Sequence, residues 1–203
     1  MEKLMSEEDE LHAQRMRELK AKQDAERRRK DIKRGVVVVN TGDGKGKSTS
    51  AFGVAIRAAG HGQRVALVQF IKGTWKTGEK EALKRFPEIE HIISGDGFTW
   101  ETQDRQQDIA SARAGFEAAK QLVDAGQHDV VILDEINVVL GYGYLPVEEV
   151  VSLVADKSEH VSMVLTGRGA PPELIEVADT VTEMRPIKHA YEAGIRARKG
   201  IEF

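Results

Sequence analysis

A glycine-rich stretch with two lysines, TGDGKGKST at residues 41–49, has the composition of a loop that binds phosphate. The usual phosphate-binding loop reads G-x-x-x-x-G-K-[ST]. Gly46, Lys47 and Ser48 supply its second half, whereas Thr41 stands where the first glycine would be. The alternative is a plain glycine-rich turn. The apolar residues before the stretch and the helical pattern after it favour the phosphate-binding loop.

Each residue type in this loop suits an anion. Gly42 and Gly44 leave the backbone able to curl its N–H groups around phosphate oxygens. The helix that we expect to begin near Lys47 adds the positive end of its dipole. Lys47 can reach the terminal phosphates, Lys45 adds a second cation, and Ser48 can hold Mg²⁺. The loop therefore predicts a nucleotide site, but it does not say which reaction follows.

An acidic pair, Asp134 and Glu135, ends an apolar run, as the acidic element of a metal site does. A carboxylate there can hold Mg²⁺ directly or through water. The alternative is a helix cap or a solvated strand end. Two arginines also have open roles: Arg57 either reaches the nucleotide or is a surface residue, and Arg168 either contacts phosphate or belongs to a plain turn.

The stretch GDGFTWETQ, residues 95–103, concentrates aromatic side chains between glycines and charges. Phe98 and Trp100 are two of only 11 aromatic residues (Phe 6, Trp 2, Tyr 3), and they do not follow the spacing of a core face. They either anchor a loop by packing or form a flat apolar wall for a large ligand beside the nucleotide. Trp75 can add to such a wall.

Apolar runs alternate with helical patterns from Gly35 onward. We expect strands within residues 35–40, 64–71, 90–94, 129–135, 160–167 and 180–187, and helices within 47–60, 104–125, 146–154 and 171–179. This alternation predicts an α/β fold of the P-loop NTPase type, with a mostly parallel sheet of about six strands and helices on both faces. Ligands of such sheets bind outside the carboxyl ends of the strands. The glycine-rich loop, the acidic pair and the aromatic stretch all fall there.

The first 34 residues form a separate segment, dense in alternating charge and free of glycine and proline. They predict either a solvated helix or disordered arm, or an arm that docks over a site or a partner subunit. We therefore divide the chain into a charged helical arm at residues 1–34 and a P-loop domain at residues 35–203.

Composition excludes several classes of function. Lys+Arg 30 against Asp+Glu 33 gives a net charge of −3, which offers no global reason to expect nucleic acid as a partner. No stretch approaches the roughly 20 apolar residues of a membrane span, and no secretory signal is visible. The chain has no cysteine, so disulfides and thiol catalysis are excluded. We expect a cytoplasmic protein.

Motifs along the chain together resemble one known family, the ATP:cob(I)alamin (corrinoid) adenosyltransferases of the P-loop type. The resemblance covers roughly residues 35–203 and is carried by TGDGKGKST, AFGVAIRAAGHG, VQFIKGTWKTGE, GFTWETQ, LDEIN, YLP, TGRG, ADTVTEMRPIKHAYEAGI and ARKGIEF, in that order. From the residues alone, a P-loop ATPase, a small-molecule kinase or a non-catalytic carrier also fits. The lack of an Asn-Lys-x-Asp motif argues against a GTPase.

The resemblance implies a reaction. The family transfers the 5′-deoxyadenosyl group of ATP to the cobalt of a reduced corrinoid, such as cob(I)alamin, cobyric acid a,c-diamide or cobinamide, and releases intact triphosphate. It implies Mg²⁺ (or Mn²⁺), a homodimer, an N-terminal helix that closes over the corrinoid, and an external flavoprotein reductant. Neither a nucleic acid nor a membrane is an expected partner.

The resemblance also implies roles for individual residues. Lys47, Glu135, Phe98 and Trp100 are expected to be catalytic, Ser48 and Glu135 to bind the metal ion, and Phe98, Trp100 and Arg168 to bind the corrinoid. The expected ATP-binding residues are Thr41, Gly42, Asp43, Gly44, Lys45, Gly46, Lys47, Ser48, Thr49 and Arg57. Asp43 departs from the asparagine frequent in the family. A carboxylate there should weaken phosphate binding unless it turns outward or meets Lys45.

Overall fold

The computed structural model describes residues 7–71, 77–94 and 104–202. The chain divides into two compact units, residues 1–33 and 34–203, one residue from the boundary predicted above. In the first unit, α1 (Glu7–Arg28) is a helix of 22 residues with no buried side chain. Four acidic residues occupy its first turn and two arginines its last. The acidic side chains lie at the positive end of the helix dipole and the arginines at its negative end. Both groups therefore stabilise a helix that has no buried side chain.

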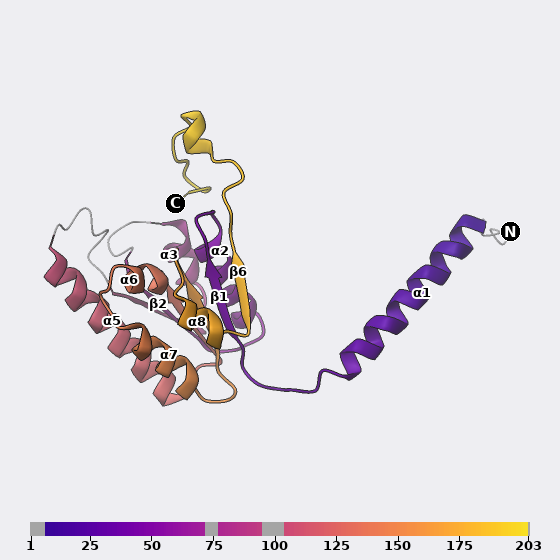
Figure 1. Ribbon diagram of the computed structural model, residues 1–203, viewed down its shortest axis with the longest axis horizontal. Coiled ribbons are helices and arrows are strands. Elements are labelled where there is room, and N and C mark those ends of the chain that lie inside the picture. The colour runs from indigo at the N-terminus through magenta and orange to yellow at the C-terminus, as the bar shows by residue number, and fades with distance from the viewer. Residues whose placement is uncertain (1–6, 72–76, 95–103, 203) are drawn as a thin grey trace. The chain divides into compact units, whose positions relative to one another are not determined.

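The second unit is a six-stranded sheet whose strand pairs are all parallel, in the order β3-β2-β4-β5-β1-β6 (Figure 1). The strands are β1 (Val37–Thr41), β2 (Val65–Gln69), β3 (Ile89–Ile93), β4 (Val130–Asp134), β5 (Ser162–Thr166) and β6 (Thr180–Glu183). The helices are α2 (Lys47–Ala59), α3 (Gly78–Leu83), α5 (Arg105–Ala125), α6 (Ile136–Gly141), α7 (Val147–Asp156), α8 (Pro172–Val177) and the 3₁₀ helix η1 (Ala190–Ala193). The predicted α/β fold with a parallel sheet is confirmed.

Alternate residues of the strands face two separate cores. Side chains such as Val39, Val68 and Leu133 pack with α5, α6, α7 and α8 on one face. Their neighbours, such as Leu67 and Ile132, pack with α2 and α3 on the other. Because successive strand residues point to opposite faces, continuous apolar runs are what a sheet covered on both sides requires.

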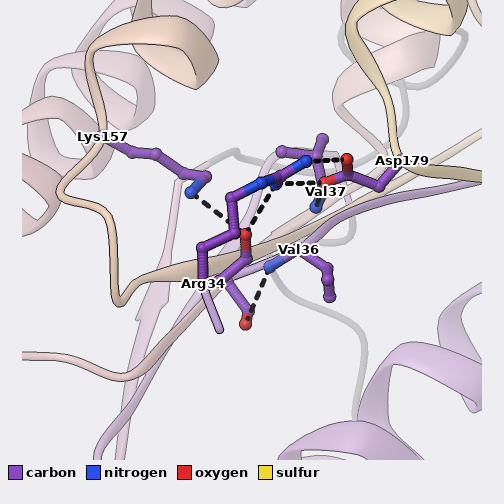
Figure 2. A network of polar contacts seen from close by, with 7 residues as sticks. Arg34, Val36, Val37, Lys157 and Asp179 are labelled. Carbon is purple, nitrogen blue, oxygen red and sulfur yellow. Dashed lines mark hydrogen bonds and ion pairs between the residues drawn. The ribbon is translucent and has the colours of Figure 1, made fainter. Parts of the chain in front are cut away.

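The amino ends of β1 and β6 are tied together by a polar network around Asp179 (Figure 2). Arg34 donates to both oxygens of Asp179, and the Val37 N–H donates to the same carboxylate at 2.8 Å. Lys157 and Arg34 both donate to the Gly35 carbonyl. These bonds hold the Asp179 pKa at about 2, chiefly through Arg34 and then through the Val37 N–H. The network fixes the amino end of β1, which is the end of the strand opposite the phosphate loop.

Two features of the fold differ from the prediction. The short helices α3 and α6 and the turn η1 were not expected, because four to six residues give too little periodicity to identify. The sixth strand ends at Glu183 rather than near residue 187, and all of its residues are exposed. None of the described helices is both long and apolar enough to cross a membrane.

Candidate nucleotide site

The glycine-rich loop joins the carboxyl end of β1 to the amino end of α2. Gly42 and Gly46 have φ values of 90° and 109°, which side chains other than glycine rarely adopt. α2 begins at Lys47, directly after Gly46. The loop therefore leads directly into the amino end of α2, and a glycine-rich loop before a helix amino end is an arrangement that binds anions.

The segment that follows β6 packs against this loop. The Gly44 N–H donates to the Met184 carbonyl at 2.6 Å, and a Cβ on Gly42 or Gly44 would lie within 2.7 Å of that carbonyl oxygen. Thr41, at the position of the missing glycine, accepts a hydrogen bond from the Ala170 N–H through its hydroxyl, at 3.0 Å. The loop is thus held from both sides, by the chain after β5 and by the chain after β6.

Lys47 is 8% exposed and lies beneath the loop. Its Nζ donates to the Gly44 carbonyl at 2.5 Å. This bond keeps the ammonium within the curve of the loop, where it can neutralise a bound anion. Lys47 and the loop backbone therefore form one preorganised group.

A cavity of about 550 Å³ opens above the loop. The loop contributes Asp43, Gly44, Lys45, Gly46, Lys47, Ser48 and Thr49. Other elements contribute Phe52, Gln69, Ile71, Thr77, Glu79, Glu135, Val138, Tyr142, Arg168, His189, Ile201 and Glu202. Most of the predicted nucleotide-binding residues therefore surround one space with Glu135 and Arg168, and that space is large enough for a nucleotide.

Glu135 is the acidic residue of the pair that reaches this cavity. Its backbone has a φ of 66°, the only positive value at a non-glycine residue in the described chain. That conformation costs free energy and turns the chain sharply between β4 and α6. Asp134, one residue earlier, is 0% exposed and does not line the cavity. The bend therefore separates the roles of two neighbouring carboxylates.

Asp134 is held by hydrogen bonds from the strands on each side. The Thr166 hydroxyl on β5 donates to Oδ1 at 2.7 Å, and the Gln69 amide on β2 donates to Oδ2 at 2.9 Å. The Thr166 oxygen in turn accepts the Glu135 N–H at 2.9 Å. The Asp134 carboxylate thus positions the Glu135 backbone through Thr166.

His91 extends this chain to β3. Because the Gln69 amide nitrogen faces a carboxylate, its oxygen must face His91, whose Nε2–H therefore donates at 2.8 Å. Burial, and then Lys80, lowers the pKa of His91, which favours the neutral ring, and the tautomer with its hydrogen on Nε2 makes this bond. Four adjacent strands are thus linked by side chains that all donate toward Asp134, from the last residues of β2 and β5 and from the middle of β3.

Two cations at the loop are paired with carboxylates. Lys45 forms an ion pair with Glu202, whose side chain is only 19% exposed. Arg168 lies 3.6 Å from Asp43, and both of these side chains are largely exposed. Asp43 therefore pairs with Arg168. The predicted contact between Asp43 and Lys45 is not made, because Lys45 pairs with Glu202.

A second cavity of about 700 Å³ adjoins the first. Thr41, Gly42, Gly169, Ile175 and Val181 are among the residues that line only this one. Asp43, Val138, Tyr142 and Arg168 line both. The Asp43–Arg168 pair therefore stands at the boundary between the two spaces.

Three of the predicted ATP-binding residues, Thr41, Gly42 and Arg57, do not line the first cavity, and two of them, Thr41 and Gly42, line the second. Arg57 is exposed in the last turn of α2 and does not line the first cavity, because ten residues of helix span about 15 Å. Its contact with a nucleotide stays a prediction. Phe98 and Trp100, like Trp75, lie outside the described residues.

Several cavity residues were missed by sequence reasoning: Gln69, Thr77, Glu79, Ile201 and Glu202. Gln69 had a signal, since it is a polar residue at the end of an apolar strand next to that of Asp134. Glu202 had none, because it is 157 residues from Lys45 along the chain.

A parallel sheet with a glycine-rich loop after β1 and an acidic residue after β4 defines a P-loop nucleotide-binding protein. The model of one family, described as ATP:corrinoid adenosyltransferase BtuR/CobO/CobP, matches residues 33–203. The chain belongs to this family, and the predicted resemblance and enzyme class are confirmed.

Individual relatives agree with this assignment. The chain is 49% identical to a corrinoid adenosyltransferase of Pseudomonas aeruginosa, over 97% of this chain and 98% of that one. It is 44% identical to a corrinoid adenosyltransferase of Escherichia coli K12, and 43% identical to the corrinoid adenosyltransferase CobA of Salmonella typhimurium, over 96% of this chain and 99% of each relative. A solved structure, flagellar accessory protein FlaH from Methanocaldococcus jannaschii, aligns at 15% identity over 75% of this chain and 72% of that one, with a TM-score of 0.46.

Proposed function

We propose that this chain binds ATP in the 550 Å³ cavity and transfers its 5′-deoxyadenosyl group to the cobalt of a reduced corrinoid. The observation that carries the proposal is the meeting of residues 43–49 with Glu135 around one space, in a chain of the adenosyltransferase family. Triphosphate would lie on the loop. The C5′ carbon of the ribose would point away from it, toward the corrinoid.

The bond changes assign an unusual task to the loop. The cobalt(I) electron pair forms the bond to C5′, while the C5′–O bond breaks and its electrons leave with intact triphosphate. Negative charge therefore develops on the triphosphate oxygen that leaves C5′, and not on an oxygen that bridges two phosphates as in ATP hydrolysis. Lys47 and the loop N–H groups supply fixed positive charge to that oxygen, and the rest of the cavity orients C5′ for in-line attack.

We infer that Ser48 and Glu135 hold Mg²⁺, or Mn²⁺, beside the triphosphate. Their hydroxyl and carboxylate oxygens are hard ligands, and both residues line the same cavity. No three His, Cys, Asp or Glu side chains cluster as a metal site in the described parts of the chain, so substrate phosphates would complete the coordination. When bound, the ion would neutralise charge on the phosphate oxygens.

The corrinoid side of the reaction rests on the family. Phe98 and Trp100 are proposed to lie against the corrin, where an apolar wall offers the cobalt no ligand and excludes water. Arg168, at the cavity rim, is proposed to contact the corrinoid as well. We further propose a cytoplasmic homodimer, α1 as a lid, and an external flavoprotein that reduces the cobalt. Light scattering of the purified chain tests the dimer.

One assay tests the reaction. The protein is incubated with Mg-ATP and chemically reduced cobalamin, the corrinoid spectrum is followed, and the phosphates are resolved. We expect adenosylcobalamin and triphosphate. ADP and phosphate with unmodified corrinoid would show a P-loop ATPase instead, and tight corrinoid binding without turnover would show a carrier. Cobinamide and cobyric acid a,c-diamide in the same assay establish the preferred corrinoid.

A further inference from the structure

The ion pair between Lys45 and Glu202 joins the phosphate loop to the segment that follows β6, which Figure 1 draws in yellow up to the carboxyl terminus. We propose that Glu202 is a built-in competitor of polyphosphate: its carboxylate holds Lys45, and a phosphate on the loop must take Lys45 away from it. Glu202 would thereby limit how tightly the site retains triphosphate after transfer. This rests on the proposed function only in taking polyphosphate as the ligand of the loop.

The position of Glu202 is built by the fold. The segment after β6 is fastened to the loop where the Gly44 N–H donates to the Met184 carbonyl, and Gly42 and Gly44 leave no room for a side chain against it. Glu202 is the more buried partner, 19% exposed against 58% for Lys45. Glu202 lines the cavity, where its N–H donates to the Arg198 carbonyl at 2.8 Å, and the more exposed ammonium of Lys45 is the partner that can turn to another anion.

Lys45 and Lys47 differ in the way this proposal requires. Lys47 is 8% exposed and its Nζ donates to the Gly44 carbonyl inside the loop. Lys45 points outward, and its partner is an anion of the same charge type as a phosphate. Competition between two anions for one ammonium weakens the binding of the incoming anion by the free energy of the existing pair. For a partly exposed pair, that amounts to about a two- to fivefold change in affinity.

Calorimetric titration of the full chain with inorganic triphosphate tests the proposal. Glu202→Gln keeps the shape and removes the charge, and we expect it to tighten binding about two- to fivefold. Lys45→Ala should weaken binding. In the Lys45→Ala background, Glu202→Gln should change the affinity by less than about 1.5-fold, because the carboxylate then has no ammonium to withhold from the phosphate.

The matched control is Glu192→Gln, which removes the same charge from η1, on the same segment but outside the cavity. It should leave the affinity unchanged. A gain from Glu202→Gln that persists without Lys45, or an equal gain from Glu192→Gln, shows general repulsion and overturns the proposal. Glu202→Asp, which keeps the charge on a shorter side chain, should bind with intermediate affinity; a gain equal to that of Glu202→Gln also counts against it. The titration contains no corrinoid, so its outcome is independent of whether adenosyl transfer occurs.

Discussion

Replacing Thr166 by valine should destabilise the protein, although the two side chains have nearly the same shape. Thr166 is 0% exposed, and its hydroxyl makes two hydrogen bonds, one donated to the Asp134 carboxylate and one accepted from the Glu135 N–H. Valine removes both and leaves a carboxylate oxygen and an N–H without these partners. Threonine and valine are therefore not equivalent here.

The expected loss can be worked from these two bonds. A hydrogen bond to a charged group contributes about 1.5–3 kcal/mol, and a hydrogen bond between neutral groups about 0.5–1.5 kcal/mol. The two terms share one side chain and overlap, so we expect a net loss of about 3 kcal/mol. With a urea m-value of about 2 kcal/mol/M, the midpoint of unfolding should fall by about 1.5 M.

Urea unfolding followed by far-UV circular dichroism measures the effect. Thr182→Val is the matched control, since it makes the same chemical change on the exposed strand β6 and should shift the free energy of unfolding by less than about 0.5 kcal/mol. Thr166→Val should also raise the Mg²⁺ concentration needed for turnover about tenfold, because Glu135 loses its support. Equal losses in the two variants would refute the reasoning that Thr166 anchors Asp134.

Three further predictions concern other parts of the chain. Lys47→Ala should reduce kcat/KM for ATP about a hundredfold or more, because it removes a fixed charge at the leaving triphosphate; normal ATP kinetics would take Lys47 out of the site. Trp100→Ala should impair turnover far more when the assay starts from cob(II)alamin than from cob(I)alamin, because the resemblance implies that Phe98 and Trp100 displace the lower axial base and favour a four-coordinate cobalt(II) that is easier to reduce; equal losses in the two assays would count against that role. Asp179→Asn should lower the free energy of unfolding at neutral pH by about 1 kcal/mol. Because folding depresses the pKa of Asp179 to about 2 from 3.8, this contribution is full above pH 4 and disappears as the pH falls toward 2, so the difference between Asp179→Asn and the parent chain in urea titrations should shrink over that window.

The sheet was predictable because its signal is local. Runs such as VALVQ and VVILD are long enough, and apolar enough on both faces, to identify strands that are buried on both sides. The helices of ten or more residues were predictable from the spacing of their apolar residues, as in α5. Of the three six-residue helices, α8 was predicted, since the prolines at its start mark a helix beginning, whereas α3 and α6 were not, because they have little pattern of their own.

The phosphate loop was also predictable from local sequence. Gly42, Gly46 and Lys47 act through backbone conformation and a helix end, both set by residues adjacent along the chain. The choice of Glu135 over Asp134 as the residue facing the cavity was part of the resemblance. Its physical cause is the positive φ of Glu135, a backbone conformation in which the Glu135 N–H bonds to the Thr166 hydroxyl on the neighbouring strand β5.

Contacts between distant residues could not be read from the chain. The pairing of Asp43 with Arg168 and of Lys45 with Glu202, and the chain of side chains from His91 through Gln69 to Asp134, each depend on the order of the strands in the sheet. Local sequence sets backbone conformation and periodicity over a few residues, so it specifies the loop and the strands. Which charged groups form pairs depends on their distance in space, and that distance is set only when the six strands assemble into the sheet in this order.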